Sequence, residues 1–223
     1  MADAEEAADD ERNFEHISLT RPPVKALSIR RNTEQPATRT VGMDALVLCG
    51  GEGTRLDAGE KPLYAVGGEP MVGRVLDAFD GSNVDTVYAA VTPQTPDTRA
   101  YVRDRATVID TSGDGYVEDL SRALETVGTP AVTAAADLPL LASEHVDSLL
   151  ARERSTSVCV PTRLQRALDV RPDRVQAVDG EKLSPSGLNL VGEGEDEIDC
   201  RWDARLAVNV NYASDATVAE RLC

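Results

Sequence analysis

The sequence predicts a doubly wound α/β fold: a mostly parallel, Rossmann-like sheet with a small β-rich insertion. Short apolar runs alternate with amphipathic segments from residue 43 onward, as expected for strands that helices cover on both faces. A glycine-rich loop directly follows the first apolar run. At 223 residues the chain is long enough to bury one substantial core.

The expected elements follow from these runs in chain order. Strands are predicted over 44–49, 86–91, 106–110, 131–136 and 158–161. Helices are predicted over 71–79, 95–104, 116–127, 143–153 and 214–222. Pro96 after Thr95 places a proline at a first helical position, and Ser143 before Glu144 opens another helix. Residues 163–202 are less regular and predict the β-rich insertion or a lid.

Residues 1–42 differ from the rest in composition. An acidic run leads into prolines and scattered arginines without any apolar period. Such low hydrophobicity cannot offset the entropy of ordering, so we predict a disordered N-terminal extension over 1–42 and one domain over 43–223. Two alternatives stay open: Met43 is the true start, or the extension is a regulatory tail.

Charge and composition exclude several classes of function. The net charge of −16 opposes nucleic-acid binding, which depends on neutralising phosphates. No apolar run approaches the roughly 20 residues that cross a bilayer, and the acidic N-terminus does not resemble a signal peptide. Of the 23 basic residues only three are lysines (Lys25, Lys61, Lys182), which leaves 20 arginines. Acidity with scarce lysine is typical of a halophilic cytosolic proteome, in which salt screens a carboxylate-rich surface.

The cysteines and histidines give little support for metal or triad chemistry. The four cysteines show no C-x-x-C spacing, which argues against a zinc site and fits a reducing cytoplasm. His16 and His145 are the only histidines, and we expect both at the surface.

Residues 48–63, L-C-G-G-E-G-T-R-L-D-A-G-E-K-P-L, form the most informative stretch. Glycines let backbone N–H groups close around phosphate oxygens, and Arg55 and Lys61 add positive charge on opposite sides. Gly59 is followed by Glu60, so the spacing of a P-loop fails, and Leu56 stands where a dinucleotide fingerprint needs its third glycine. The remaining pattern, G-G-x-G-T-R with a downstream K-P, resembles the loop of sugar-nucleotide and cofactor nucleotidyltransferases; the alternative is an ordinary strand-to-helix turn.

Two further strand ends carry polar residues. Asp137 follows the run 131–136, and one carboxylate there suits Mg²⁺, which takes one or two protein carboxylates together with substrate phosphates. The alternative for Asp137 is a turn cap. The loop 110–116, which follows the strand predicted over 106–110, could contact a base edge or a substrate, or could be a plain turn before a helix.

Five segments together resemble the archaeal, haloarchaeal-type GTP:adenosylcobinamide-phosphate guanylyltransferases, within the MobA-like nucleotidyltransferase superfamily. They are M-D-A-L-V-L-C-G-G-E-G-T-R with E-K-P-L, T-P-Q-T-P-D-T-R-A-Y-V from Thr92, V-I-D-T-S-G-D-G-Y-V-E-D-L from Val108, S-P-S-G-L-N-L-V from Ser184, and V-N-V-N at 208–211. The segment from Val108 is the most specific of these. The resemblance covers the chain except residues 1–42, although 163–201 match poorly outside S-P-S-G-L-N.

The resemblance implies a site and its ligands. The GTP phosphates would be held by Gly50, Gly51, Gly53, Thr54, Arg55 and Lys61, of which Arg55 and Lys61 would be catalytic. Guanine would contact the loop with Ser112, Gly113, Gly115 and Tyr116. Asp137 would hold Mg²⁺, and the α-phosphate and acceptor side would be lined by Gly187, Asn189, Asn209 and Asn211. Cys49 stands where the family usually has alanine, so a weak redox sensitivity is an added expectation.

The implied reaction transfers GMP from GTP to adenosylcobinamide phosphate. The implied partners are these two substrates, with neither nucleic acid nor membrane, and a homodimer stays open. Two alternatives remain: a molybdenum-cofactor guanylyltransferase, which normally carries G-P-L-A-G where residues 111–116 stand, or a nucleotide-binding module without turnover.

Overall fold

The computed structural model describes residues 29–30, 42–51, 53, 56 and 59–223. The strands of its main sheet are β1 (Ile29–Arg30), β2 (Asp44–Leu48), β5 (Val87–Val91), β6 (Thr107–Asp110), β7 (Ala131–Ala135), β8 (Thr156–Pro161), β9 (Gln176–Val178), β10 (Glu181–Val191) and β11 (Glu197–Cys200). A separate small hairpin pairs β3 (Ala65–Val66) with β4 (Glu69–Pro70). The helices are η1 (Lys61–Leu63), α1 (Met71–Asp80), α2 (Pro96–Val102), α3 (Tyr116–Val127), α4 (Ser143–Leu150), α5 (Thr162–Ala167) and α6 (Ala213–Leu222).

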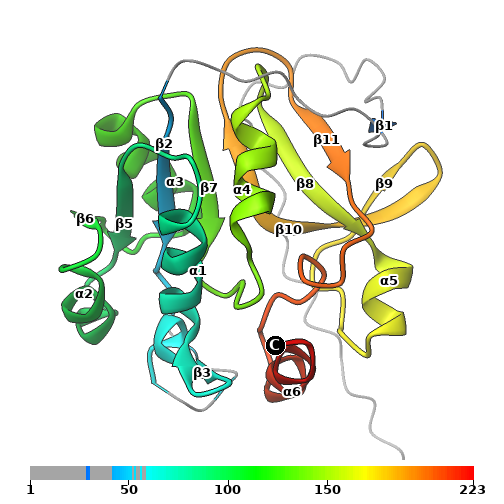
Figure 1. The fold of residues 1–223 in the computed structure, drawn as a ribbon, viewed down its shortest axis with the longest axis horizontal. Coiled ribbons are helices and arrows are strands. Elements are labelled where there is room, and N and C mark those ends of the chain that lie inside the picture. The colour runs from blue at the N-terminus through cyan, green and yellow to red at the C-terminus, as the bar shows by residue number, and fades with distance from the viewer. Residues whose placement is uncertain (1–28, 31–41, 52, 54–55, 57–58) are drawn as a thin grey trace, which may run out of the picture.

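Alternating side chains on the strands explain why helices cover both faces of the sheet. In β2, Ala45 and Val47 face the core cluster that contains the buried side chains of α1 and α4. Leu46 and Leu48 face the opposite cluster, where Ala123 of α3 packs. Figure 1 shows the result, with α1 and α4 on the near face of the sheet and α3 behind it. The predicted α/β layering is therefore confirmed.

The strand order locates the natural ligand-binding crevice. The order is β1-β11-β8-β10-β7-β2-β5-β6. From β2 the chain moves outward through β5 to β6, and it then returns to the other side of β2 with β7. The strands β2, β5, β6 and β7 are parallel, so their carboxyl ends meet at one edge of the sheet. Ligands of open α/β sheets bind at such a switch point, which here lies between β2 and β7.

The segment predicted as an insertion or lid is part of the main sheet. Strand β10 runs antiparallel between β7 and β8, and β11 extends the sheet beyond β8. Sequence periodicity could not show this, because a strand's place in a sheet depends on partners far away in the chain. Ile29–Arg30, within the predicted extension, pair with β11; the prediction for the rest of 1–41 lies outside the described residues.

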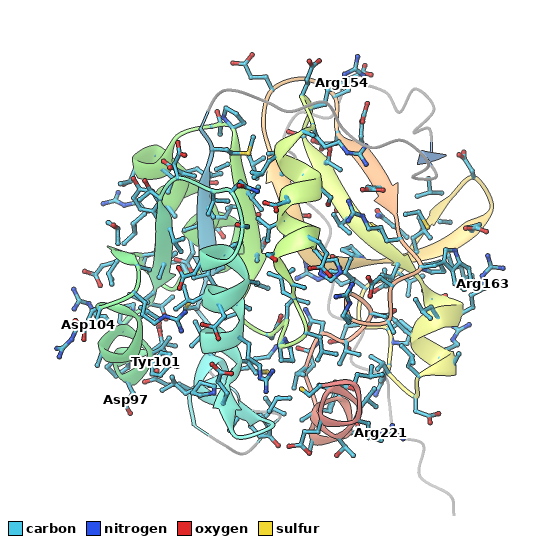
Figure 2. The ribbon with its side chains drawn as sticks, viewed as in Figure 1. Asp97, Tyr101, Asp104, Arg154, Arg163 and Arg221 are labelled. Atoms are coloured by element: carbon cyan, nitrogen blue, oxygen red, sulfur yellow. The ribbon has the colours of Figure 1, made fainter. Side chains whose placement is uncertain are left out.

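The surface carries the charge expected from the composition. Asp97, Asp104 and Arg154 project from the outline of the molecule in Figure 2, and all three are exposed. Nearly all the apolar side chains of β2, β7 and β8 are buried. None of the described helices combines the length and apolar character needed to cross a bilayer.

Candidate active site

The glycine-rich loop leaves the carboxyl end of β2 and closes on itself. The Lys61 N–H donates to the Gly51 carbonyl across 3.1 Å. Gly53 has φ +67°, and a Cβ there would lie 3.0 Å from the Lys61 backbone nitrogen. A Cβ on Gly51 would lie 3.1 Å from Cδ of Lys61, so the missing side chain makes room for the lysine stem. The glycines thus hold Lys61 against the loop.

The end of the loop is also fastened to α2. The Glu60 carboxylate accepts hydrogen bonds from the backbone N–H groups of Asp97, at 2.8 Å, and Thr98, at 2.6 Å. These are first-turn amides that lack partners within the helix. Glu60, which the sequence did not single out, therefore fixes the backbone directly before Lys61.

Lys61 is the centre of a polar cluster built from three distant segments. Its Nζ lies 2.5 Å from Asp137 Oδ2 and 2.5 Å from Asn211 Oδ1. Asn209 Nδ2 donates to Asp137 Oδ1 at 2.8 Å, and Asn211 Nδ2 donates to Asn209 Oδ1 at 2.8 Å. The side chains of Lys61 and Asp137 are each 16% exposed. We call these four residues the lysine cluster.

The backbone holds the two asparagines in this position. The Val210 N–H donates to the Asp137 carbonyl at 3.0 Å. The backbone N–H groups of Asn211 and Tyr212 both donate to Asp215 Oδ2, at 3.0 Å and 2.9 Å. Burial raises the pKa of Asp215, while these two hydrogen bonds oppose the rise. Asp215 therefore ties residues 209–212, which we call the asparagine segment, to the first turn of α6.

Two cavities meet at Asp137. The first, of about 250 Å³, lies between the ends of β2 and β7 and the loop before α3. It is lined by Leu48, Cys49, Gly50, Gly51, Lys61, Pro62, Ala90, Thr92, Thr111, Gly113, Gly115, Tyr116, Asp119, Ala135, Ala136 and Asp137. The second, of about 1040 Å³, is lined by Tyr116, Ala135, Asp137, Gln165, Arg171, Asp173, Arg174, Ser184, Pro185, Gly187, Asn189, Asn209, Asn211 and Tyr212. Tyr116, Ala135 and Asp137 line both cavities and form their common border.

Most of the residues predicted for the site lie at these cavities. Gly50, Gly51, Lys61, Gly113 and Gly115 line the first. The second is lined by Gly187, Asn189, Asn209 and Asn211, whereas Tyr116 and Asp137 line both. Gly53 shapes the loop behind Lys61. Ser112 is exposed and lines neither cavity. Thr54 and Arg55 lie outside the described residues.

Asp119 was missed by sequence reasoning and shapes the loop before α3. It is 7% exposed, and its Oδ1 accepts a hydrogen bond from the Gly113 N–H at 2.9 Å. Gly113 has φ +77°, a conformation that favours glycine. An aspartate in the first turn of a helix is the available signal, but it does not reveal that the carboxylate reaches back to the loop.

Cys49 is protected by burial. Its side chain is fully buried, and desolvation raises the pKa of the thiol far above its usual value. The thiolate is the reactive form, so this structure argues against the redox sensitivity expected from the sequence.

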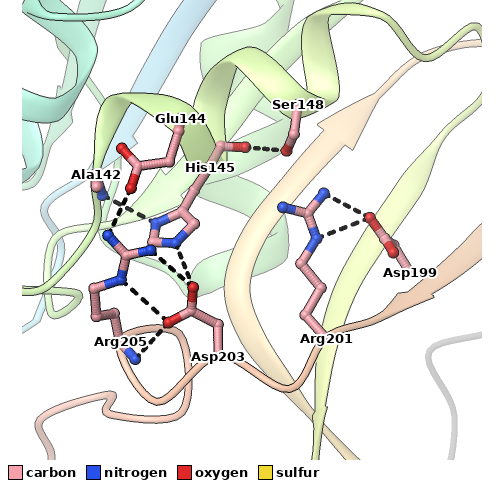
Figure 3. A network of polar contacts seen from close by, with 8 residues as sticks. All are labelled: Ala142, Glu144, His145, Ser148, Asp199, Arg201, Asp203 and Arg205. Atoms are coloured by element: carbon pink, nitrogen blue, oxygen red, sulfur yellow. Dashed lines mark hydrogen bonds and ion pairs between the residues drawn. The ribbon is translucent and has the colours of Figure 1, made fainter. Parts of the chain in front are cut away.

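His145 is buried, which contradicts the prediction of a surface histidine. The ring is 3% exposed and its Nδ1 accepts from the Ala142 N–H at 3.1 Å, so Nε2 carries the proton and donates to Asp203 Oδ2 at 2.9 Å. Arg205 in turn contacts Asp203 and Glu144 (Figure 3). Burial and the nearby Arg205 lower the pKa of His145, and the hydrogen bond to Asp203 opposes them.

This network belongs to the scaffold of the site. It fastens the segment that precedes Asn209 onto α4, and α4 directly follows the loop after Asp137. Burial alone would raise the pKa of the Asp203 carboxyl. Its hydrogen bonds with Arg205 and His145 together outweigh burial, so the pKa is lowered. The segment carrying Asn209 is thus anchored by a carboxylate that stays ionised.

The fold and the site define a class of protein: a nucleotide-binding α/β protein with a glycine loop, a lysine and an aspartate at the switch point of its sheet. The model of the MobA-like NTP transferase domain matches residues 45–181. An adenosylcobinamide-phosphate guanylyltransferase from Methanocaldococcus jannaschii is 30% identical over 190 residues, which cover 81% of this chain and 97% of that protein. The chain therefore belongs to the MobA-like NTP transferases and, among them, to the adenosylcobinamide-phosphate guanylyltransferase family.

More distant similarities cover smaller parts of this chain. A bifunctional GlmU protein from Bifidobacterium longum is 32% identical over 117 residues, 48% of this chain and 25% of its own length. A hypothetical transferase from Thermus thermophilus superposes with a TM-score of 0.53 at 24% identity, covering 68% of this chain and 66% of that one. The structure of CMP:2-keto-3-deoxy-manno-octonic acid synthetase complexed with CTP superposes with a TM-score of 0.52 at 18% identity, covering 68% of this chain and 74% of that one. At these identities the two structures show the fold alone.

Proposed function

We propose that this protein transfers GMP from GTP to the phosphate of adenosylcobinamide phosphate, giving adenosylcobinamide-GDP and pyrophosphate in cobamide (vitamin B12) biosynthesis. An oxygen of the acceptor phosphate attacks the α-phosphorus of GTP, and the bond from that phosphorus to the pyrophosphate oxygen breaks. One observation carries the proposal: two cavities meet at Asp137, with Lys61 beside the border. A transferase that joins two substrates needs such adjoining sites.

In this proposal the first cavity takes the nucleotide. Backbone N–H groups of the loop at Gly50 and Gly51 face the phosphates, and Lys61 supplies a positive charge. The loop with Gly113 and Gly115, held by Asp119, contacts the guanine. The second cavity is the larger of the two, at about 1040 Å³ against about 250 Å³, and takes the bulkier acceptor.

The residues present account for catalysis by positioning and charge. A phosphate monoester is already ionised near neutral pH, so the attacking oxygen needs no general base. Consistent with this, no histidine occurs among the described residues that line either cavity. Lys61 would stabilise the negative charge that develops on the transferred phosphoryl group. Arg55, outside the described residues, is proposed for the same role.

The lysine cluster also fits a magnesium ion. It offers the Asp137 carboxylate, a hard oxygen donor of the kind that Mg²⁺ prefers, while the amide oxygens of Asn209 and Asn211 accept hydrogen bonds within the cluster. Asp137 pairs with Lys61 here, and no group of three acidic, histidine or cysteine side chains gathers in the described part of the chain. Such a site would hold the ion by one carboxylate together with substrate phosphates. The ion would offset charge on the triphosphate and on the leaving pyrophosphate.

The test is a transfer assay in high KCl with Mg²⁺, α-labelled GTP and adenosylcobinamide phosphate. The proposal predicts label in the corrinoid together with equimolar pyrophosphate. Transfer to a molybdopterin but not to the corrinoid would identify a molybdenum-cofactor guanylyltransferase instead. Binding of GTP without pyrophosphate release for either acceptor would identify a non-catalytic nucleotide-binding module.

A further inference from the structure

Two arginines line the second cavity and form no ion pair with any described residue. Arg171 and Arg174 lie between α5 and β9, and both are exposed. Among the described residues neither guanidinium lies within ion-pair distance of a carboxylate. By contrast, Arg99, Arg105 and Arg205 pair with aspartates at 2.6–2.9 Å. Arg171 and Arg174 therefore place two positive charges at one cavity wall of a chain whose net charge is −16.

The two side chains stand at defined places along that wall. Arg174 is near enough to the Tyr116 hydroxyl to lower its pKa, although burial raises that pKa more strongly and Asp137 adds to the rise. Arg174 lines the second cavity together with Tyr116, which also lines the first. The Arg171 guanidinium lies 6.0 Å from the centroid of the Tyr212 ring, a cation–π distance that restrains it beside the asparagine segment.

The surrounding charges show why these arginines matter. Asp137 and Asp173 also line the cavity, so its wall is not uniformly basic. The whole chain repels anions, and an anionic acceptor can approach only where local positive charge offsets this field. A guanidinium binds a phosphate through two parallel N–H···O bonds, which fixes orientation as well as position.

Resting on the proposed function, we propose that Arg171 and Arg174 bind the phosphate group of the acceptor and present its oxygen to the nucleotide in the first cavity. The two arginines would distinguish a phosphorylated acceptor from the same molecule without its phosphate. GTP binding does not depend on them, because they line only the second cavity.

The experiment compares Arg171→Ala and Arg174→Ala with Arg166→Ala. Arg166 is an exposed arginine of α5 that lines neither cavity, so its variant controls for the loss of one positive charge. Losing a charge-assisted phosphate contact should raise the KM for adenosylcobinamide phosphate at least about tenfold in each variant. The KM for GTP and the affinity for GTP measured without acceptor should stay within about twofold, and Arg174→Lys should recover part of the loss.

A second measurement separates phosphate contacts from ring contacts. Binding of adenosylcobinamide, which lacks the phosphate, should be the same for wild type and both variants, whereas binding of adenosylcobinamide phosphate should weaken. Three results would overturn the inference while leaving the proposed function intact. The variants could lose the same affinity for both corrinoid ligands, they could lose affinity for GTP instead, or their KM for the acceptor could be unchanged. A wild-type protein that transfers nothing to this acceptor would overturn both.

Discussion

Replacing Lys61 by methionine tests the centre of the proposed site. The substitution keeps much of the side chain's length and removes its charge. Lys61 Nζ makes two contacts of 2.5 Å, to Asp137 and Asn211. If that charge moves to the phosphates during transfer, its loss removes about 2.7–4 kcal/mol of transition-state stabilisation, or roughly 100- to 1000-fold in kcat.

The same substitution has a separate cost in stability. Without Lys61, the partly buried Asp137 carboxylate keeps the Asn209 amide as a partner and loses its counter-charge. Leaving such a group poorly paired costs about 1–3 kcal/mol. For a domain of this size each kcal/mol lowers Tm by about 2–4 °C, so a drop of roughly 2–12 °C is expected. The fold itself should survive.

The assay measures kcat by pyrophosphate release and Tm by calorimetry on the same preparations. Lys182→Met is the matched control, since Lys182 is an exposed residue of β10 and lines neither cavity. It should leave kcat unchanged and Tm within about 1 °C. If Lys61→Met keeps kcat within about threefold of wild type while folded, the phosphate assignment is wrong.

Three further predictions concern the site and its scaffold. Asp137→Asn should lower kcat at least about 100-fold and shift the Mg²⁺ titration to higher concentration; an unchanged Mg²⁺ midpoint would refute the metal assignment. Gly187 has φ +95°, and a Cβ there would lie 3.4 Å from Asn209 Nδ2. Gly187→Ala should therefore destabilise the fold by about 1–3 kcal/mol, measured by urea unfolding, and an unaltered midpoint would show that the strain is absent. Because burial lowers the pKa of His145, its neutral form favours folding: that stability is complete above the usual pKa of about 6.5 and is lost as pH falls toward the lower folded value. His145→Gln should flatten the decline in unfolding free energy between about pH 7 and 5, whereas the same slope as wild type would exclude this role.

The fold class could be predicted from the sequence because each strand and helix has its own local pattern of apolar residues and helix-start residues. The run before Cys49 reads as a buried strand, and Pro96 does begin α2. The prediction failed for β10, which is a central antiparallel strand and not a separate insertion or lid. Its partners β7 and β8 precede it by many residues, and no local period encodes such pairing.

Some residues of the candidate site could likewise be predicted from local motifs, and others could not. Gly51, Lys61 and Asp137 lie on local motifs at strand ends, so their proximity could be expected from the rule that parallel strands end at one edge. Asp119 could not be expected to hold the loop, because its contact depends on how the chain turns before α3. Arg171 carries no motif at all and is placed only by the course of the chain after α5.

By itself, the sequence determined the alternation of strands and helices, the glycine loop with its lysine, and the single aspartate at a strand end. These features are local, and backbone geometry and side-chain chemistry within a few residues suffice to define them. Only the tertiary structure decided that Lys61, Asp137 and Asn211 form one cluster, and that two cavities share a border at Asp137. Such contacts join residues up to 150 positions apart, and they arise because the sheet buries its apolar faces in one particular strand order.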